Sequence, residues 1–236
     1  QHQNETTGAN KMGIGVVLMG KSGTGKTTSL RNINPDKALL IQVTRKALPF
    51  KSANWKPWDG KTKTGTVAVT DKASNIVAAI QRASDNGKEI VIVDDFQYLM
   101  ANEFMSRSSE RGYDKFTDIA RHAWDVMQAA INAPEHIRVY ILTHTETDDY
   151  GLNAKIKTIG KMLDEKICLE GLFTIVLKTI KNDDGYFFAT QNDGTDTVKS
   201  PIDMFNSELI VNDVAEIDRT ICEYYGIKEA KQEQAE

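Results

Sequence analysis

A glycine-rich segment near the start of the chain constrains the fold more than any other feature. Residues 20–27, GKSGTGKT, match the pattern G-x-x-x-x-G-K-[ST] at every fixed position. They follow an apolar run, residues 15–19, and lead into residues 27–31, which suit a helix. In this strand, loop and helix context, the backbone N–H groups of the loop turn inward around an anion. We interpret the segment as a phosphate-binding loop; the alternative is a plain turn between a strand and a helix.

A nucleotide bound at this loop would make defined contacts. The N-terminus of the following helix adds a partial positive charge. Lys26 would reach the β and γ phosphates, and Thr27 would offer its hydroxyl to Mg²⁺. The residues predicted to bind the nucleotide are Gly20, Lys21, Ser22, Gly23, Thr24, Gly25, Lys26, Thr27 and Thr28.

A second strand ends in two carboxylates. In residues 89–95, EIVIVDD, four apolar residues precede Asp94 and Asp95, which is the pattern of a Walker B strand. Asp94 would hold the Mg²⁺ shell, typically through water, and Asp95 would orient or deprotonate the attacking water. Two adjacent carboxylates repel each other unless a cation compensates, which supports a metal site at Thr27 and Asp94. The alternative is that the aspartates cap a helix.

The spacing of the two motifs indicates a class of enzyme. Between Lys26 and Asp94 there is room for at least one further strand. That spacing favours ATPases that hydrolyse with a protein carboxylate over the simpler kinase and GTPase arrangement, so the expected cofactors are ATP and Mg²⁺. His144 ends a later apolar run and could sense the γ-phosphate, or could simply be a histidine in a polar loop. The predicted catalytic residues are Lys26, Asp95 and His144.

The patterning of apolar residues predicts an α/β fold. Ser74 is predicted to cap a helix, and the dipeptide Asp184-Gly185 is predicted to turn a β-hairpin. Strands that alternate with helices predict a three-layer P-loop NTPase with a mostly parallel central sheet and a C-terminal β-hairpin. The expected strands are residues 15–19, 38–43, 66–70, 89–95, 138–144, 172–180 and 186–190, and the expected helices are residues 74–83, 113–132 and 213–225.

Length and composition limit what surrounds this fold. In a chain of 236 residues we expect one domain, residues 12–226, between a flexible segment, 1–11, and a polar tail, 227–236. A formal net charge of −4 gives no global basic footprint, so contact with nucleic acid would need a local patch or an oligomer. Cys168 and Cys222 have neither disulfide nor zinc spacing, and no apolar run approaches a membrane span. We expect a cytoplasmic protein with no membrane partner.

A cluster of three lysines follows the strand that ends at His144. Lys155, Lys157 and Lys161 lie in the segment NAKIKTIGKML. A lysine at a subunit boundary could stabilise charge that develops on a neighbouring subunit's nucleotide. The same lysines could instead grip a nucleic-acid backbone, or could belong to a solvated loop.

A second basic segment, residues 45–65, follows the second strand and shows neither helical nor strand periodicity. Six basic side chains in it face one acidic residue, Asp59, and Phe50, Trp55 and Trp58 are interleaved among them. A protein that binds single strands needs cations along the phosphate backbone and aromatic rings on which the bases can stack. Tryptophans in a loop also serve as anchors to the core or as oligomer contacts, so both interpretations remain open.

With these motifs, the chain resembles the phage-type RecA-core ATPases that accompany single-strand annealing and recombination proteins. The likeness runs from residue 12 to residue 201, in the order GKSGTGKTT, IVIVDDF, VYILTH, TIGKMLDEKICLEGLFTIVLKT and ATQNDGTDTVKSP. It implies a RecA-like central sheet, ATP hydrolysis coupled to DNA, in particular single-stranded DNA, and assembly into a homo-oligomer. It also implies a role in phage recombination or replication in the host cytoplasm, with a phage single-strand-binding or annealing protein as a partner.

The chain departs from that family at the tip of the second strand. RecA-type enzymes usually place a catalytic glutamate there, whereas residues 41–45, IQVTR, contain no carboxylate. Either Asp95 takes over the role of the base, or hydrolysis is slow and nucleotide binding acts mainly as an assembly switch. The alternative functions are a nucleotide-gated module that binds or anneals single strands with little turnover, and an AAA+ switch of the helicase-loader type.

Overall fold

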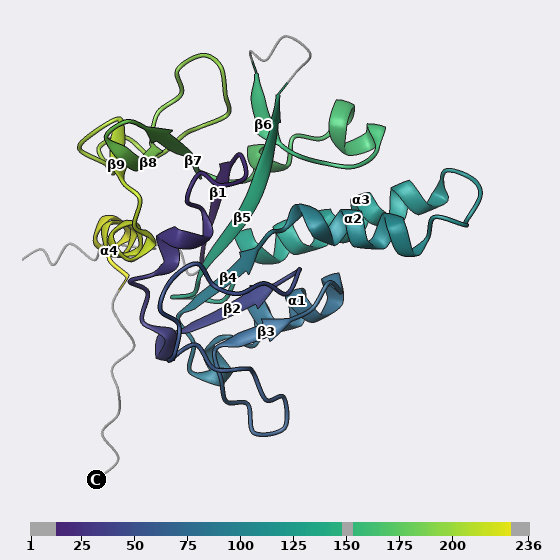
Figure 1. The fold of residues 1–236 in the computed structure, drawn as a ribbon, viewed down its shortest axis with the longest axis horizontal. Coiled ribbons are helices and arrows are strands. Elements are labelled where there is room, and N and C mark those ends of the chain that lie inside the picture. The colour runs from purple at the N-terminus through teal and green to yellow at the C-terminus, as the bar shows by residue number, and fades with distance from the viewer. Residues whose placement is uncertain (1–12, 148–152, 228–236) are drawn as a thin grey trace, which may run out of the picture.

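The structure is a computed structural model that describes residues 13–147 and 153–227 (Figure 1). The segment predicted to be flexible, 1–11, lies outside the described residues, as does almost all of the predicted polar tail. Among the described residues, no helix has both the length and the apolar character needed to cross a membrane.

A mostly parallel sheet of nine strands forms the centre of the fold. The strand order is β3-β2-β4-β5-β1-β7-β8-β9, and β6 pairs with β5 outside this path. Strands β3, β2, β4, β5, β1 and β7, which are neighbours in this order, pair parallel to one another. Strand β8 pairs antiparallel with β7, β9 with β8, and β6 with β5. The strands are β1 Ile14–Gly20, β2 Ala38–Gln42, β3 Val67–Val69, β4 Ile90–Asp94, β5 Arg138–Thr147, β6 Ala154–Ile156, β7 Ile175–Asn182, β8 Gly185–Ala189 and β9 Leu209–Val211.

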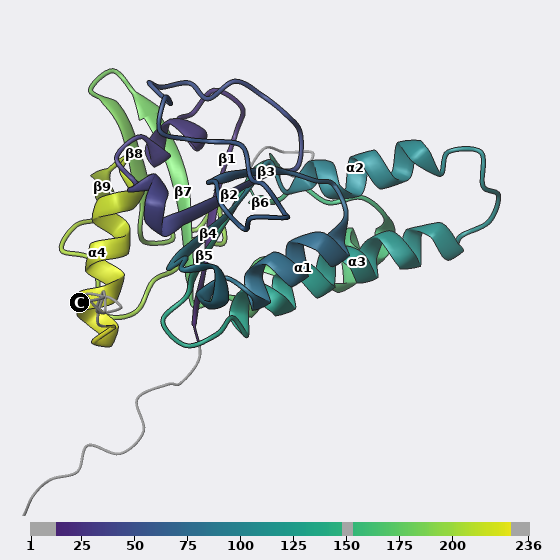
Figure 2. The same ribbon diagram turned by 90° about the horizontal axis from the view of Figure 1, so that it is seen from below.

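Helices cover both faces of the sheet, which confirms the predicted three-layer α/β fold (Figures 1 and 2). Val17 and Met19 of β1 belong to the core shared with α1, α2 and α3, while Val16 and Leu18 belong to the core shared with α4. This alternation follows from the period of two along a strand. The helices are α1 Ala73–Gln81, α2 Gln97–Ser106, α3 Asp114–Ile131 and α4 Val214–Tyr225.

A buried ion pair fixes α4 on its side of the sheet. Asp218 of α4 accepts hydrogen bonds from Arg138 Nε at 3.0 Å and Nη2 at 2.8 Å, and from the Tyr140 hydroxyl at 2.7 Å. Both donors belong to β5, so one carboxylate ties the last helix to a central strand. Asp213 begins the helix by accepting a hydrogen bond from the backbone N–H of Ala215 at 3.0 Å.

Three local predictions were wrong. The element after the phosphate-binding loop is a 3-10 helix of four residues, Thr27–Leu30, so it contributes little dipole charge at the loop. Ser74 does not cap α1, because the N-cap position is Lys72. The hairpin turn consists of Asp183 and Asp184 rather than Asp184-Gly185, because Asn182 pairs with Gly185.

Three of the helices and strands escaped the sequence analysis. Helix α2 directly follows β4, β6 pairs antiparallel with the end of β5, and β9 adds an edge strand beside β8. The predicted hairpin itself is confirmed as β7 and β8. Strands β2 and β3 fall between the two motif strands in sequence, and β5 separates β1 from β4 in the sheet.

Candidate active site

The carboxyl ends of the parallel strands bring the predicted site residues to one edge of the sheet. The register pairs Gly20 of β1 with His144 of β5, and Gln42 of β2 with Asp94 of β4. The phosphate-binding loop, both aspartates and the histidine therefore lie at the same edge of the sheet, although β5 continues beyond His144 to Thr147. In open α/β sheets, this edge is where ligands bind.

The phosphate-binding loop is braced by the strand beside it. The Thr24 and Thr179 hydroxyls lie 2.5 Å apart, so β7 supports the loop from one side. Gly25 has a φ of 97°, in the left-handed region that favours glycine. A Cβ atom there would lie 3.0 Å from the Tyr186 ring and 3.2 Å from the Asn212 side chain, so glycine is also needed for space.

Lys26 lies beneath the loop, with a side chain that water hardly reaches. The residue is 6% exposed, and its Nζ donates hydrogen bonds of 2.8 Å to the carbonyl oxygens of Gly20 and Lys21. Burial lowers the pKa of Lys26 to about 8, although the charges of Asp95 and Asp94 partly offset the effect. Both hydrogen-bond acceptors are neutral, so a phosphate group would offer this ammonium a charged partner.

Thr27 and Asp94 form the predicted metal-binding pair. The Thr27 hydroxyl lies 3.2 Å from Oδ1 and 3.0 Å from Oδ2 of Asp94. Asp94 is only 4% exposed, and burial together with the charge of Asp95 raises its pKa to about 6. A divalent cation bound here would offset both the cost of burying the Asp94 carboxylate and its repulsion by Asp95.

This pair suits Mg²⁺ better than a metal held by a protein cage. Among the described residues, no group of three or more histidine, cysteine, aspartate or glutamate side chains could hold a metal. Mg²⁺ is typically bound by one or two protein oxygens together with water and substrate phosphates. The Thr27 hydroxyl and the Asp94 carboxylate would supply the protein oxygens of such a site.

Asp95 sits between two basic side chains. One carboxylate oxygen forms an ion pair with Lys46, and the other lies 3.5 Å from Nε2 of His144. Burial alone would raise the pKa of Asp95, but the hydrogen bonds from His144 and Lys46 lower it to about 2. A carboxylate with so low a pKa holds and orients a water molecule well but is a weak base. The helix-capping alternative does not apply, because α2 has Phe96 at its N-cap.

Lys46 was not among the predicted site residues, although it was noted in the basic segment. It follows β2, at the strand tip where a glutamate was sought and none was found. Its ammonium lies 5.2 Å from the centre of the Tyr98 ring, which in turn lies 6.2 Å from the His144 ring. The Gln42 side chain holds the Lys46 backbone through a hydrogen bond of 2.9 Å to its carbonyl oxygen. Only the adjacency of β2 and β4 shows that Lys46 belongs to the site.

Gln97, in the first turn of α2, is a second residue that the sequence did not indicate. Its side-chain oxygen accepts a hydrogen bond of 3.1 Å from the backbone N–H of His144 and lies 3.4 Å from the Thr143 hydroxyl. Gln97 therefore ties α2 to the strand that carries the predicted sensor.

The three clustered lysines have different surroundings. Lys155 donates to the carbonyl oxygen of Asp164 at 2.8 Å and lies 3.5 Å from a Glu146 carboxylate oxygen, so it supports the local fold. The backbone of Lys157 donates to the carbonyl oxygen of His144 at 2.9 Å, and its side chain is exposed. Lys161 is exposed and precedes a π-helical turn. Lys155 and Lys157 both contact β5, and of the three lysines Lys157 is the one bonded to His144 itself.

The tryptophans of residues 45–65 anchor this segment on both faces of the sheet. Trp55 packs on the core beneath α4 and meets Phe50 edge-on, with ring centres 6.2 Å apart. Trp58 packs on the core beneath α1 and α3. Both are half-buried, as the anchoring interpretation requires, and both leave some surface in the groove beside β3.

Comparisons with known proteins give limited information. No protein-family profile and no curated protein sequence matches the chain. Among solved structures, it is similar to the P4 protein of bacteriophage phi6 in complex with ADP, with 14% identity, a TM-score of 0.39, and coverage of 79% of this chain and 60% of that one. It is also similar to the KaiC-like protein PH0186 of Pyrococcus horikoshii, with 15% identity, a TM-score of 0.39, and coverage of 75% and 78%.

These likenesses are too weak to carry an argument about function. The chain spans 60% of the length of the P4 protein.

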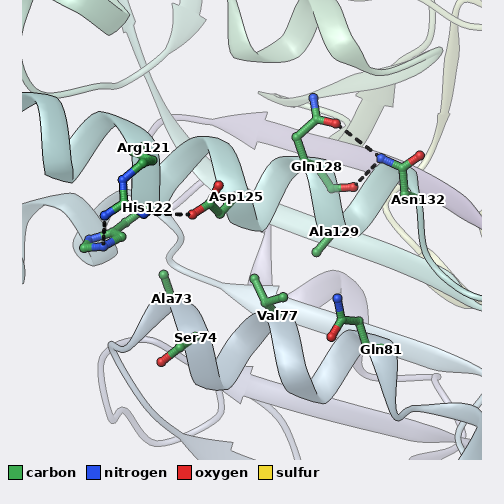
Figure 3. Close-up of a pocket in the computed structure, with 10 residues that line it drawn as sticks. All are labelled: Ala73, Ser74, Val77, Gln81, Arg121, His122, Asp125, Gln128, Ala129 and Asn132. Atoms are coloured by element: carbon green, nitrogen blue, oxygen red, sulfur yellow. Dashed lines mark hydrogen bonds and ion pairs between the residues drawn. The ribbon is translucent and has the colours of Figure 1, made fainter.

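A groove between α1 and α3 lies apart from this site (Figure 3). Its polar side chains are largely occupied with one another. The Asn132 amide donates to the carbonyl oxygen of Gln128 at 2.9 Å, and Arg121 lies 3.8 Å from Asp125. None of the predicted site residues lines it.

Proposed function

We propose that the protein is a Mg²⁺-dependent ATPase with a RecA-like P-loop core. The observation that carries this proposal is the hydrogen-bonded pair of Thr27 and Asp94 beside the buried Lys26. A phosphate-binding loop, a hydroxyl ligand and a strand-end carboxylate then meet at one point. A plain strand-to-helix turn would not need that arrangement.

Each site residue has a role in this proposal. Lys26 binds the β and γ phosphates, and Thr27 and Asp94 hold the metal. When bound, Mg²⁺ neutralises charge on the phosphate oxygens. Asp95 accepts a hydrogen bond from the attacking water and so orients it, and His144 positions Asp95 and lies where it can respond to the γ-phosphate.

We further propose that the protein acts on single-stranded DNA as a homo-oligomer, in phage recombination or replication. Support comes from the basic segment, residues 45–65, which adjoins the site through Lys46. The motifs shared with phage RecA-core ATPases point the same way. In this oligomer we propose that the exposed Lys157, whose backbone is bonded to His144, acts on a neighbouring subunit's nucleotide.

One observation favours a second candidate function. Both carboxylate oxygens of Asp95 are engaged, one by Lys46 and the other by His144. In this arrangement Asp95 is not free to orient water, which would suit a nucleotide-gated single-strand-binding module with little turnover.

Steady-state ATP hydrolysis tests the proposal and separates the two candidates. Hydrolysis is measured with Mg²⁺ alone, with single-stranded DNA and with duplex DNA, each at two salt concentrations. Stimulation by single strands that fades with salt supports the proposed ATPase. Binding of single strands without turnover supports the module, and hydrolysis that ignores DNA contradicts the proposed action on DNA.

A further inference from the structure

A groove beside the second strand has the charge of a polyanion site. The lining residues come from the segment after β2 and from β3, and none of them carries a carboxylate. Two of them, Arg45 and Lys46, are cations. The segment that forms most of the groove, residues 45–65, holds six basic residues and one acidic residue, in a chain whose formal net charge is −4. The groove is thus locally positive in a chain whose net charge is negative.

The groove also offers flat apolar surface. Trp55, Pro57 and Trp58 contribute to its lining, and each tryptophan is held from behind by the core. Unpaired bases can pack on such rings, whereas the bases of a duplex are already stacked on each other. The occupant that fits both properties is a single-stranded nucleic acid.

Lys46 belongs to this groove and to the candidate active site at once. Its side chain is 50% exposed, whereas the Asp95 side chain with which it pairs is 9% exposed. A phosphate in the groove could therefore reach the lysine but not the aspartate behind it. The other groups that face this pair are His144, against the second oxygen of Asp95, and the Tyr98 ring.

We propose that a single strand bound in this groove draws Lys46 away from Asp95 and so frees the carboxylate to orient the attacking water. The inference rests on the proposed function, since it assigns to Asp95 the role given above. The strand phosphates replace Asp95 as the partner of Lys46, so the total number of ion pairs is kept. Nucleic-acid binding thereby switches on hydrolysis through a single side chain.

Tryptophan fluorescence tests the docking step without any turnover. The chain has three tryptophans, of which only Trp124 lies outside residues 45–65, so a Trp124→Phe background reports on the groove. An oligothymidylate strand should quench this fluorescence, and its affinity should fall as salt rises. No quenching, or equal affinity for a duplex of the same length, would overturn the proposal.

Hydrolysis by variants of Lys46 tests the switch. Lys46→Met should raise hydrolysis in the absence of DNA several-fold and should remove most further stimulation by oligothymidylate. Lys46→Arg, which can still pair with Asp95, should raise the rate without DNA far less than Lys46→Met does and should remain stimulated by oligothymidylate. The matched control is Lys72→Ala, which removes an exposed lysine 3.5 Å from Asp71, outside the site, and should behave as the wild type. Lower hydrolysis by Lys46→Met would overturn the proposal.

A reciprocal measurement protects the test against a variant that folds poorly. If Asp95 and the strand compete for Lys46, Asp95→Asn should bind oligothymidylate several-fold more tightly than the wild type. Unchanged or weaker binding by a folded Asp95→Asn protein would contradict the competition. Failure of the proposed function is distinguishable, because the wild type would then hydrolyse no ATP under any condition.

Discussion

The affinity of the protein for a magnesium–nucleotide complex should follow a bell-shaped pH profile. Asp94 must be ionised to receive the metal, and burial together with the charge of Asp95 raises its pKa to about 6. Lys26 must be protonated to bind phosphate, and burial lowers its pKa to about 8. Affinity should therefore be highest between these two values and should decline on both sides.

The expected size of the effect follows from the two pKa values. One pH unit below the pKa of Asp94, or one pH unit above the pKa of Lys26, the fraction of protein in the binding protonation state falls about tenfold. This corresponds to ~1.4 kcal/mol of binding free energy. Affinity at about pH 5 and at about pH 9 should thus be about tenfold below the plateau. An aspartate and a lysine with ordinary pKa values would leave the profile nearly flat from about pH 5 to about pH 9.

Calorimetric titration with a non-hydrolysable ATP analogue and Mg²⁺, at constant ionic strength, measures this profile. Asp94→Asn is the matched control, because it should bind more weakly, lose the acid limb and keep the alkaline limb. An affinity that stays flat between about pH 5 and about pH 9 would refute the assignment of both buried groups to the ligand.

Three further changes should have distinct outcomes. Asp95→Asn should leave nucleotide affinity near that of the wild type and slow hydrolysis strongly. If binding assays and turnover assays show that affinity and hydrolysis fall equally, Asp95 has a structural role. The double change of Trp55 and Trp58 to Ala should lower the melting temperature because both rings are anchored in the core, and a wild-type melting curve would contradict that packing. Asp218→Asn should lower the free energy of unfolding, towards the lower end of about 3–5 kcal/mol in urea titrations, because the buried Arg138 loses its hydrogen-bonded carboxylate and keeps only the longer contact of 3.6 Å to Glu89. The exposed Glu223→Gln on the same helix should have little effect.

Much of the sheet was predictable because its central strands are buried on both faces. Parallel strands of this kind appear in the sequence as continuous apolar runs, as in β2 and β4, where every residue is buried. The residues at the ends of such runs then fall at one edge of the sheet. For this reason the sequence indicates Asp94, Asp95 and His144 as site residues, whereas it indicates Lys26 through the glycine-rich motif.

The remaining features depend on contacts between distant segments. Lys46 and Asp95 lie far apart in the chain, and only the pairing of β2 with β4 brings them together. Helix α2 has a weak amphipathic pattern, with Leu99 and Met100 buried side by side. The short element after the phosphate-binding loop ends at Leu30, and four residues later Asn34 caps a new turn that begins at Pro35. A longer helix would have to end before this proline, which the helix compatibility of the preceding residues does not reveal.

Phosphate release from ATP by the wild type and by Lys26→Ala tests the central claim most directly. Both proteins are assayed with Mg²⁺ and with excess chelator, and circular dichroism establishes that the variant is folded. The account predicts hydrolysis by the wild type that requires Mg²⁺, and none above background by Lys26→Ala. Equal hydrolysis by the two proteins, or hydrolysis that survives removal of the metal, would contradict it.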